Sequence, residues 1–121
     1  KKKTVLIVED EVILSKVLQD KLFDNGFDVV YARNGAEGLE KLSEGNIDLI
    51  LLDIIMPVLD GMDMLRILRE ERKSKIPVIV LTNLGSDDDA KVALGSGASE
   101  FLIKANHSLD DVLNKIQEIL G

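Results

Sequence analysis

The chain has 121 residues, of which 22 are acidic and 15 are lysine or arginine, so its formal net charge at pH 7 is -7. This length suits one domain, and a hydrophobic content of 45% argues against intrinsic disorder. The acidic excess argues against direct nucleic-acid binding, because that affinity comes largely from lysine and arginine neutralising phosphates. The absence of cysteine excludes disulfides and thiolate chemistry, and a single histidine excludes a multi-histidine metal site.

The N-terminus begins with three lysines, as a signal peptide can, but the apolar run that follows stops at Glu9. This run is too short for the hydrophobic region of a signal peptide, and the other apolar runs fall far short of a membrane span. These patterns predict a soluble, cytoplasmic protein that makes no membrane contact.

Five short runs have the composition of parallel strands that are buried on both faces. In chain order they are residues 4–8, 28–32, 48–52, 77–81 and 101–103. Segments with helical periodicity follow each run. Their expected core residues are Ile13, Val17, Leu18 and Leu22, then Ala36, Leu39 and Leu42, then Met62, Leu65 and Leu68, and then Ala90, Ala93 and Leu94.

The ends of two helices carry recognisable signals. Asn25-Gly26 suits a left-handed helix C-cap. Ser108 is expected to cap the last helix, with Asp111 three residues later and Val112, Leu113 and Ile116 on its apolar face. Strict alternation of strand and helix predicts an α/β fold: a doubly wound, five-stranded parallel sheet with helices on both sides, in one domain over residues 1–121.

Polar residues stand where four of the predicted strands end. Glu9 and Asp10 follow the first strand, Asp53 the third, Thr82 the fourth and Lys104 the fifth. Ligands bind beyond the carboxyl ends of the strands in open parallel sheets, so these side chains are expected to meet there. The second strand offers only Arg33 and Asn34, which predicts a peripheral position for it.

The three carboxylates would repel one another by about 4 kcal/mol per pair at 4 Å with an effective dielectric constant near 20. A divalent cation offsets such repulsion, and ligands that are all oxygens favour Mg²⁺. The alternative is that each acid is an ordinary turn residue at a strand end. The presence of Thr82 and Lys104 on the same rim favours a site.

These residues lie within four motifs, LIVEDE, LLDIIMPVLDG, VIVLT and GASEFLIK, whose order and spacing resemble those of response-regulator receiver domains over essentially the whole chain. The resemblance implies a flavodoxin-like strand order, 2-1-3-4-5, with five helices in two layers. It also implies a phosphorylation-activated switch in two-component signal transduction. Asp53 would accept a phosphoryl group from a sensor histidine kinase or a histidine phosphotransfer protein.

The resemblance further assigns a role to each site residue. Asp10, Asp53 and the backbone carbonyl of Ile55 would ligate Mg²⁺ directly, and Glu9 would hold the ion through water. Lys104 and Thr82 would contact phosphoryl oxygens. Thr82 would then move inward, and Phe101 would follow it; plain core packing of Phe101 is the alternative.

A receiver is not an enzyme in the usual sense, although it assists its own phosphorylation and slow autodephosphorylation. The apolar residues Ile55 and Leu84 flank the expected phosphoryl position, which predicts slow hydrolysis because they exclude or misorient water. The resemblance leaves the kinase and the output open. It allows an effector domain or effector partner and a phosphorylation-dependent dimer.

One departure from the family concerns Lys104-Ala105, since the family usually has a proline after the lysine, joined by a cis peptide. This departure keeps open a receiver-like interaction domain that works without phosphorylation. An aspartyl-phosphate phosphatase would need Asp-x-Asp where this chain has Asp10-Glu11-Val12, and a flavin-binding module would need a phosphate loop where the chain has acids. No P-loop motif occurs either.

Overall fold

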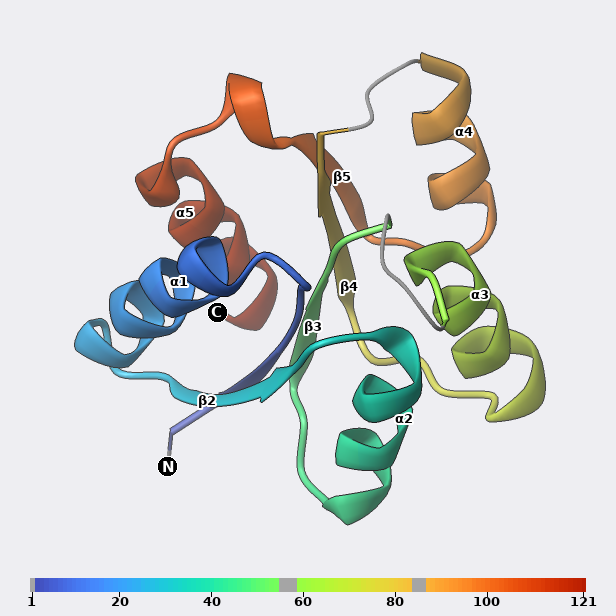
Figure 1. The fold of residues 1–121 in the computed structure, drawn as a ribbon, viewed down its shortest axis with the longest axis horizontal. Helices are drawn as coiled ribbons and strands as arrows, with labels where there is room; N and C mark the ends of the chain where they lie inside the picture. The colour runs from blue at the N-terminus through green and yellow to red at the C-terminus, as the bar shows by residue number, and fades with distance from the viewer. Residues whose placement is uncertain (1, 55–58, 84–86) are drawn as a thin grey trace.

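A parallel sheet forms the centre of the computed structural model, which describes residues 2–54, 59–83 and 87–121 (Figure 1). Within these residues the strand order is β2-β1-β3-β4-β5. The strands are β1 (Thr4–Val8), β2 (Asp28–Ala32), β3 (Leu49–Leu52), β4 (Val78–Thr82) and β5 (Glu100–Ile103). The helices are α1 (Val12–Asp24), α2 (Gly35–Glu44), α3 (Gly61–Arg66), α4 (Asp87–Gly95) and α5 (Leu109–Leu120). The predicted α/β fold and its strand order are confirmed.

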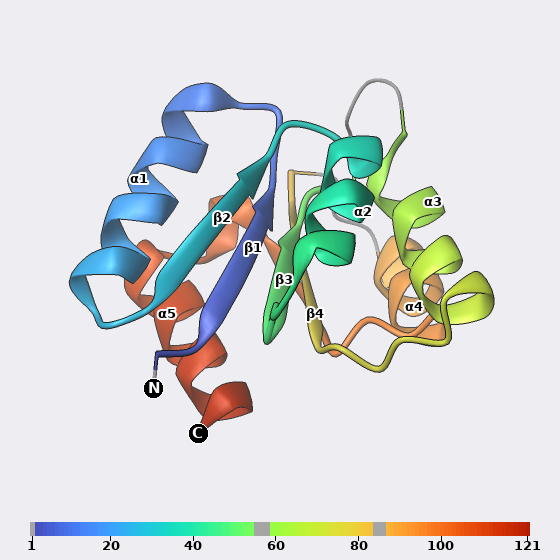
Figure 2. The ribbon, with the colours of Figure 1, turned by 90° about the horizontal axis from the view of Figure 1, so that it is seen from below.

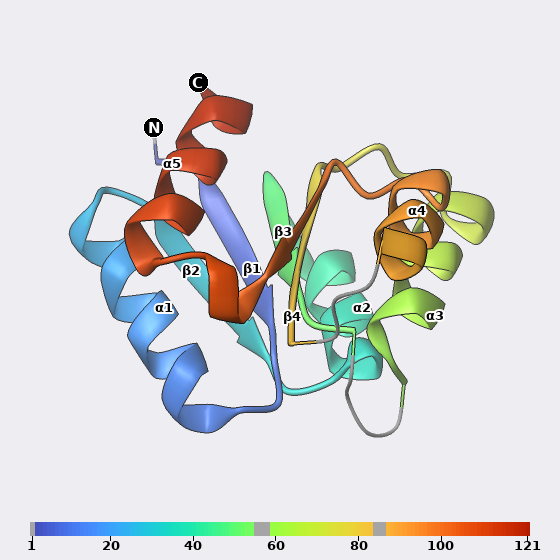
Figure 3. The ribbon, with the colours of Figure 1, turned by 90° about the horizontal axis from the view of Figure 1, so that it is seen from above.

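The helices form two layers, with α1 and α5 on one face of the sheet and α2, α3 and α4 on the other (Figures 2 and 3). Successive strand residues point to opposite faces, so β1 contributes Val5 and Ile7 to the core under α1 and α5. Leu6 and Val8 enter the core on the α2, α3 and α4 side. Burial on both faces explains why the strand sequences are continuously apolar.

The edge strands are less buried than the central ones. Every residue of β3 and β4 is buried, whereas β2 has one buried residue, Ala32. The predicted peripheral position of the second strand is therefore confirmed.

The helix ends follow the predicted signals. Ser108 Oγ accepts a hydrogen bond from the Asp111 N–H at 3.1 Å, and Asp111 Oδ2 accepts one from the Ser108 N–H at 2.9 Å. This reciprocal pair is a capping box, which satisfies two donors at the start of α5. After α1, Gly26 has a φ of 90°, in the left-handed region that glycine adopts without strain.

The predicted apolar face of α1 is wrong in part. Ile13 is 82% exposed and Val17 39% exposed, whereas Ser15, Leu18 and Leu22 are buried. At 3.6 residues per turn, Ile13 and Val17 lie on the side roughly opposite to Ser15, Leu18 and Leu22.

The predicted core of α4 is also wrong at one position: Ala93 is fully buried, but the larger Leu94 next to it is exposed. Consecutive helical residues point in different directions, so only one of this pair can face the sheet.

Three predicted strand starts shift by one residue. Asp48 lies outside β3, where its carboxylate accepts a hydrogen bond from the Thr4 N–H at 2.8 Å. Strand β4 begins after Pro77, which has no N–H to donate, and it includes Thr82. Strand β5 begins at Glu100.

Among the described residues, no helix is long and apolar enough to cross a membrane.

Candidate functional site

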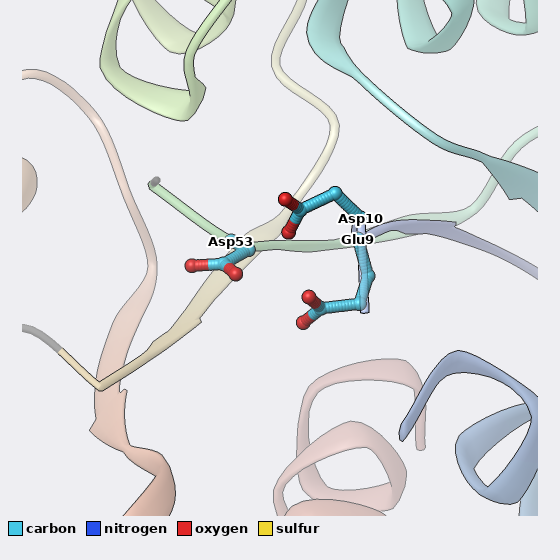
Figure 4. A group of neighbouring side chains, drawn as sticks. All are labelled: Glu9, Asp10 and Asp53. Carbon is cyan, nitrogen blue, oxygen red and sulfur yellow. The ribbon is translucent and has the colours of Figure 1, made fainter. Parts of the chain in front are cut away.

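Three carboxylates converge at the carboxyl ends of β1 and β3, which are neighbours in the sheet. Glu9 and Asp10 follow β1, and Asp53 follows β3. The Asp53 N–H donates to the Val8 carbonyl at 3.0 Å, which extends the ladder by one residue. One carboxylate oxygen from each side chain lies within 4.8 Å of the others, and Figure 4 shows Glu9 and Asp10 turned toward Asp53.

The three acids differ in burial. Glu9 is 2% exposed and Asp53 is 5% exposed, whereas Asp10 is exposed. Burial raises the pKa of Glu9 from 4.5 to about 7; a hydrogen bond from Lys104 opposes this rise, and the nearby charge of Asp53 adds to it. The cluster thus contains one carboxyl group that gains a proton near neutral pH when no cation is bound.

Lys104 lies among these acids at the end of β5, with a side chain only 10% exposed. Its Nζ is 2.9 Å from Glu9 Oε1, 3.1 Å from Glu11 Oε1 and 3.2 Å from Asp53 Oδ2. Burial alone would lower the pKa of Lys104, but its hydrogen bonds and these carboxylate charges outweigh burial and raise that pKa. The lysine therefore stays charged and offsets part of the acidic excess.

Thr82 is the last residue of β4 and is fully buried. Phe101 lies on the neighbouring strand β5, opposite Val80, where it is half-buried and packs against the core on the α2, α3 and α4 side. A pocket of about 180 Å³ opens between the strand ends. Its lining residues are Asp10, Glu11, Asp53, Thr82, Asn83 and Lys104.

The structure therefore brings together five of the predicted site residues: Glu9, Asp10, Asp53, Thr82 and Lys104. Phe101 lies outside the pocket lining, packed against the core on the α2, α3 and α4 side. Ile55 and Leu84, for which a carbonyl ligand and a water-excluding side chain are predicted, lie outside the described residues.

The Lys104-Ala105 peptide lies in the described part of the chain, where every peptide bond is trans. Lys104 begins a 3-10 turn, Lys104–Asn106, and it reaches the carboxylates from there. The proximity of Lys104 to Asp53 is thus achieved without the cis bond usual in the family.

Sequence reasoning missed two residues that touch this cluster. Glu11 contributes both its carboxylate, to Lys104, and its N–H, which donates to Glu9 Oε2 at 3.0 Å. The run of three acids from Glu9 to Glu11 was a signal for this contact. Tyr31, on β2, donates its hydroxyl to the Glu9 carbonyl at 2.8 Å, and no local pattern in the sequence singles it out.

The donor set fits a hard divalent cation. It consists of carboxylate oxygens, and among the described residues neither a histidine nor a cysteine joins the group. Mg²⁺ is commonly held by one or two carboxylates together with water and substrate oxygens, which leaves room for the exposed, pocket-lining Asp10 to act as a ligand.

The chain is similar in sequence and in structure to known proteins. The protein-family model described as the response regulator receiver domain matches residues 5–117. Two uncharacterized transcriptional regulatory proteins of Bacillus subtilis are similar: YcbL is 40% identical over 99 residues, and YkoG is 39% identical over 116 residues. These alignments cover 82% and 96% of this chain but only 43% and 50% of the relatives, so the chain spans about half their length.

Solved structures agree with the sequence matches. A Francisella response regulator receiver domain superposes with a TM-score of 0.92 at 31% identity, covering 98% of this chain and 96% of the other. A chain from the structure of the CheX-CheY-BeF3-Mg²⁺ complex of Borrelia burgdorferi matches with a TM-score of 0.90 at 32% identity, covering 98% of this chain and 90% of the other.

Proposed function

We propose that this chain, which belongs to the response regulator receiver domain family, is a phosphorylation-activated signalling switch with Asp53 as its phosphoacceptor. One observation carries the proposal: the buried Asp53 carboxylate lies 3.2 Å from the Lys104 ammonium group, whose side chain is 10% exposed, and within 4.8 Å of two further carboxylates. We assign residues 1–121 to a single receiver domain.

The proposed reaction uses an Asp53 oxygen as the nucleophile. It attacks the phosphorus of a phosphohistidine on a sensor histidine kinase or a histidine phosphotransfer protein. An O–P bond forms, the P–N bond breaks, and the histidine ring leaves with the electron pair of that bond and takes up a proton. Such transfers depend mainly on positioning and charge neutralisation. Lys104 supplies a fixed positive charge next to the attacking carboxylate.

Receiver domains bind Mg²⁺ at their acidic site. In this chain Asp10 and Asp53 would be direct ligands, together with the Ile55 carbonyl, and Glu9 would hold the ion through water. The bound ion supplies charge neutralisation for the acids and for the incoming phosphoryl group. Among these proposed ligands, the Asp10 carboxylate is best placed to exchange the ion with solvent, because its side chain is exposed.

The switch is proposed to start at Thr82, whose hydroxyl would hydrogen-bond a phosphoryl oxygen. Phe101, on the adjacent strand, would move into the space that Thr82 leaves. Added negative charge is a common trigger for such local rearrangements. The half-buried position of Phe101, on the strand next to Thr82, supports this role.

The output is proposed to be an effector domain or an effector partner, because the matched relatives are transcriptional regulators about twice as long as the aligned region. A phosphorylation-dependent dimer is a further proposed consequence. The receiver itself, at a net charge of -7, is proposed to act in the cytoplasm without touching nucleic acid.

The experiment is phosphorylation by a small phosphoramidate with and without Mg²⁺, followed by intact mass. We expect one added phosphoryl group in Mg²⁺ on the unmodified chain, none on Asp53→Asn, and much slower transfer to Lys104→Ala. Lys91→Ala, which removes an exposed lysine on α4, is the matched control and should react as the unmodified chain does. No added mass with an active donor would overturn the proposal and favour an interaction domain that works without phosphorylation.

A further inference from the structure

We propose that Tyr31 is a positioning residue for the cation-binding carboxylates, because its hydroxyl fixes the peptide group that joins Glu9 to Asp10. This inference rests on the Mg²⁺ site proposed above. It adds a residue from the edge strand β2, whose own carboxyl end contributes no ligand to the cluster.

The Glu9 backbone is held by β2 on both of its polar groups. The Glu9 N–H donates to the Ala32 carbonyl at 3.0 Å. The Glu9 carbonyl accepts the Tyr31 hydroxyl at 2.8 Å, a distance typical of a well-formed hydrogen bond. The first contact continues the regular pairing of β1 with β2. The second comes from a side chain and lies beyond the last residue pair of the two strands, Val8 and Ala32.

This contact restrains the position of Asp10. Its side chain is exposed, so packing does not hold its carboxylate in place. The orientation of the peptide before a residue, together with φ of that residue, sets the direction of its Cα–Cβ bond, and the Tyr31 hydroxyl restrains that peptide by its carbonyl oxygen. Glu9 differs, since Lys104 Nζ and the Glu11 N–H hold its carboxylate directly.

The ring and the hydroxyl of Tyr31 have separable roles. The ring packs against the core on the α1 and α5 side, together with Leu14 and Val29. Phenylalanine keeps this packing, so Tyr31→Phe removes only the hydrogen bond. The Glu9 carbonyl is then free to rotate with its peptide, and the ligands lose preorganisation toward the cation.

The test is Mg²⁺ binding to the whole chain by calorimetry, with thermal unfolding in Mg²⁺-free buffer as a measure of fold. Tyr31→Phe should weaken Mg²⁺ binding by about 2- to 10-fold, the range that the net value of one hydrogen bond corresponds to. Ser43→Ala is the matched control: it also removes a hydroxyl that donates to a backbone carbonyl, that of Leu39, but on α2. It should leave Mg²⁺ affinity unchanged.

Backbone amide resonances give a readout that does not depend on affinity. In Mg²⁺-free buffer the Asp10 amide should shift in Tyr31→Phe, because it belongs to the released peptide. Equal Mg²⁺ affinity in the unmodified chain and Tyr31→Phe would overturn the inference, even if the melting temperature fell. Failure of the unmodified chain to bind Mg²⁺ would instead count against the proposed cation site itself, so the two failures are distinguishable.

Discussion

Glu9 couples the charge state of the site to pH. Its pKa in the folded chain is about 7, above its ordinary value of 4.5, because burial disfavours the charged form. Without Mg²⁺, the folded chain therefore holds this proton over a pH range in which the unfolded chain has released it. Raising the pH from about 4.5 to about 7 should lower the free energy of unfolding by on the order of 2 kcal/mol through this group.

Denaturant unfolding at a series of pH values in a chelating buffer measures this effect. The control is Glu9→Gln, which cannot ionise and should show a flatter profile over the same range. If the unmodified chain and Glu9→Gln had the same stability at every pH, burial of Glu9 would not make the free energy of unfolding depend on pH. In excess Mg²⁺ the dependence should change sign, because the ion competes with the proton for the carboxylates.

Gly61 is a second residue that determines the geometry of the site, because it has no side chain. A Cβ at this position would lie 2.8 Å from the Ile54 Cα and would collide with the backbone carbonyl of Asp53. The Gly61 N–H also donates to the Ile54 carbonyl at 2.9 Å. Gly61→Ala should therefore displace Asp53, lower stability by about 1–3 kcal/mol and weaken Mg²⁺ binding.

The matched change is Gly95→Ala at the end of α4, where a Cβ would meet no heavy atom within 4 Å and φ is not in the left-handed region. It should be neutral or stabilising by about 0.5–1 kcal/mol, because alanine restricts the unfolded chain. Thermal unfolding and Mg²⁺ titration of Gly61→Ala and Gly95→Ala measure these effects on stability and on Mg²⁺ affinity. Unchanged Mg²⁺ affinity in Gly61→Ala would show that the loop can shift without moving Asp53.

At the scale of elements, one arginine ties together segments at the far end of the sheet. A π-helical segment, Ile67–Glu71, continues α3 and carries Arg69. The Arg69 guanidinium donates to the Gly97 carbonyl at 2.8 and 3.2 Å and to the Ser74 carbonyl at 3.0 Å. Burial partly removes the Arg69 charge from water and so lowers the pKa of Arg69. This contact joins the end of α3 to the turn between α4 and β5.

Arg69→Ala should lower the free energy of unfolding by about 1–3 kcal/mol, because it removes three hydrogen bonds donated by a charged group to the Gly97 and Ser74 carbonyls. Arg66→Ala is the control, since Arg66 makes an exposed 3.6 Å ion pair with Glu71, and such pairs contribute little. Denaturant unfolding compares the two. Equal losses would mean that the Gly97 and Ser74 contacts add nothing to the attachment of α4.

For the whole molecule, strand positions and order were predictable because burial on both faces leaves a continuous apolar signal, as in Thr4–Val8. The convergence of Glu9, Asp53 and Lys104 was predictable from strand ends, since parallel strands deliver those residues to one edge. Helix faces were less predictable. Ile13 and Val17 share an apolar character with Leu18, and only tertiary packing shows that Leu18 faces the sheet.

Contacts between distant segments were the least predictable. The hydrogen bond from Tyr31 to Glu9 joins residues 22 positions apart, and it depends on the register of β1 against β2 and on one side-chain rotamer. The ion pair between Glu11 and Lys104 joins residues 93 positions apart. The run of acids from Glu9 to Glu11 was a signal for the second contact, whereas the register and the rotamer behind the first contact leave no local trace in the sequence.

Asp53 is the proposed phosphoacceptor, and locating the phosphoryl group on the chain is the sharpest test of that role. The whole chain should be phosphorylated by a phosphohistidine donor in Mg²⁺, then digested and mapped by mass spectrometry, with a second receiver domain confirming that the donor is active. One phosphoryl group is expected, on the peptide that contains Asp53, and Asp53→Asn should lose it. A phosphoryl group on any other residue, or none while the second receiver reacts, would show that Asp53 is not the phosphoacceptor.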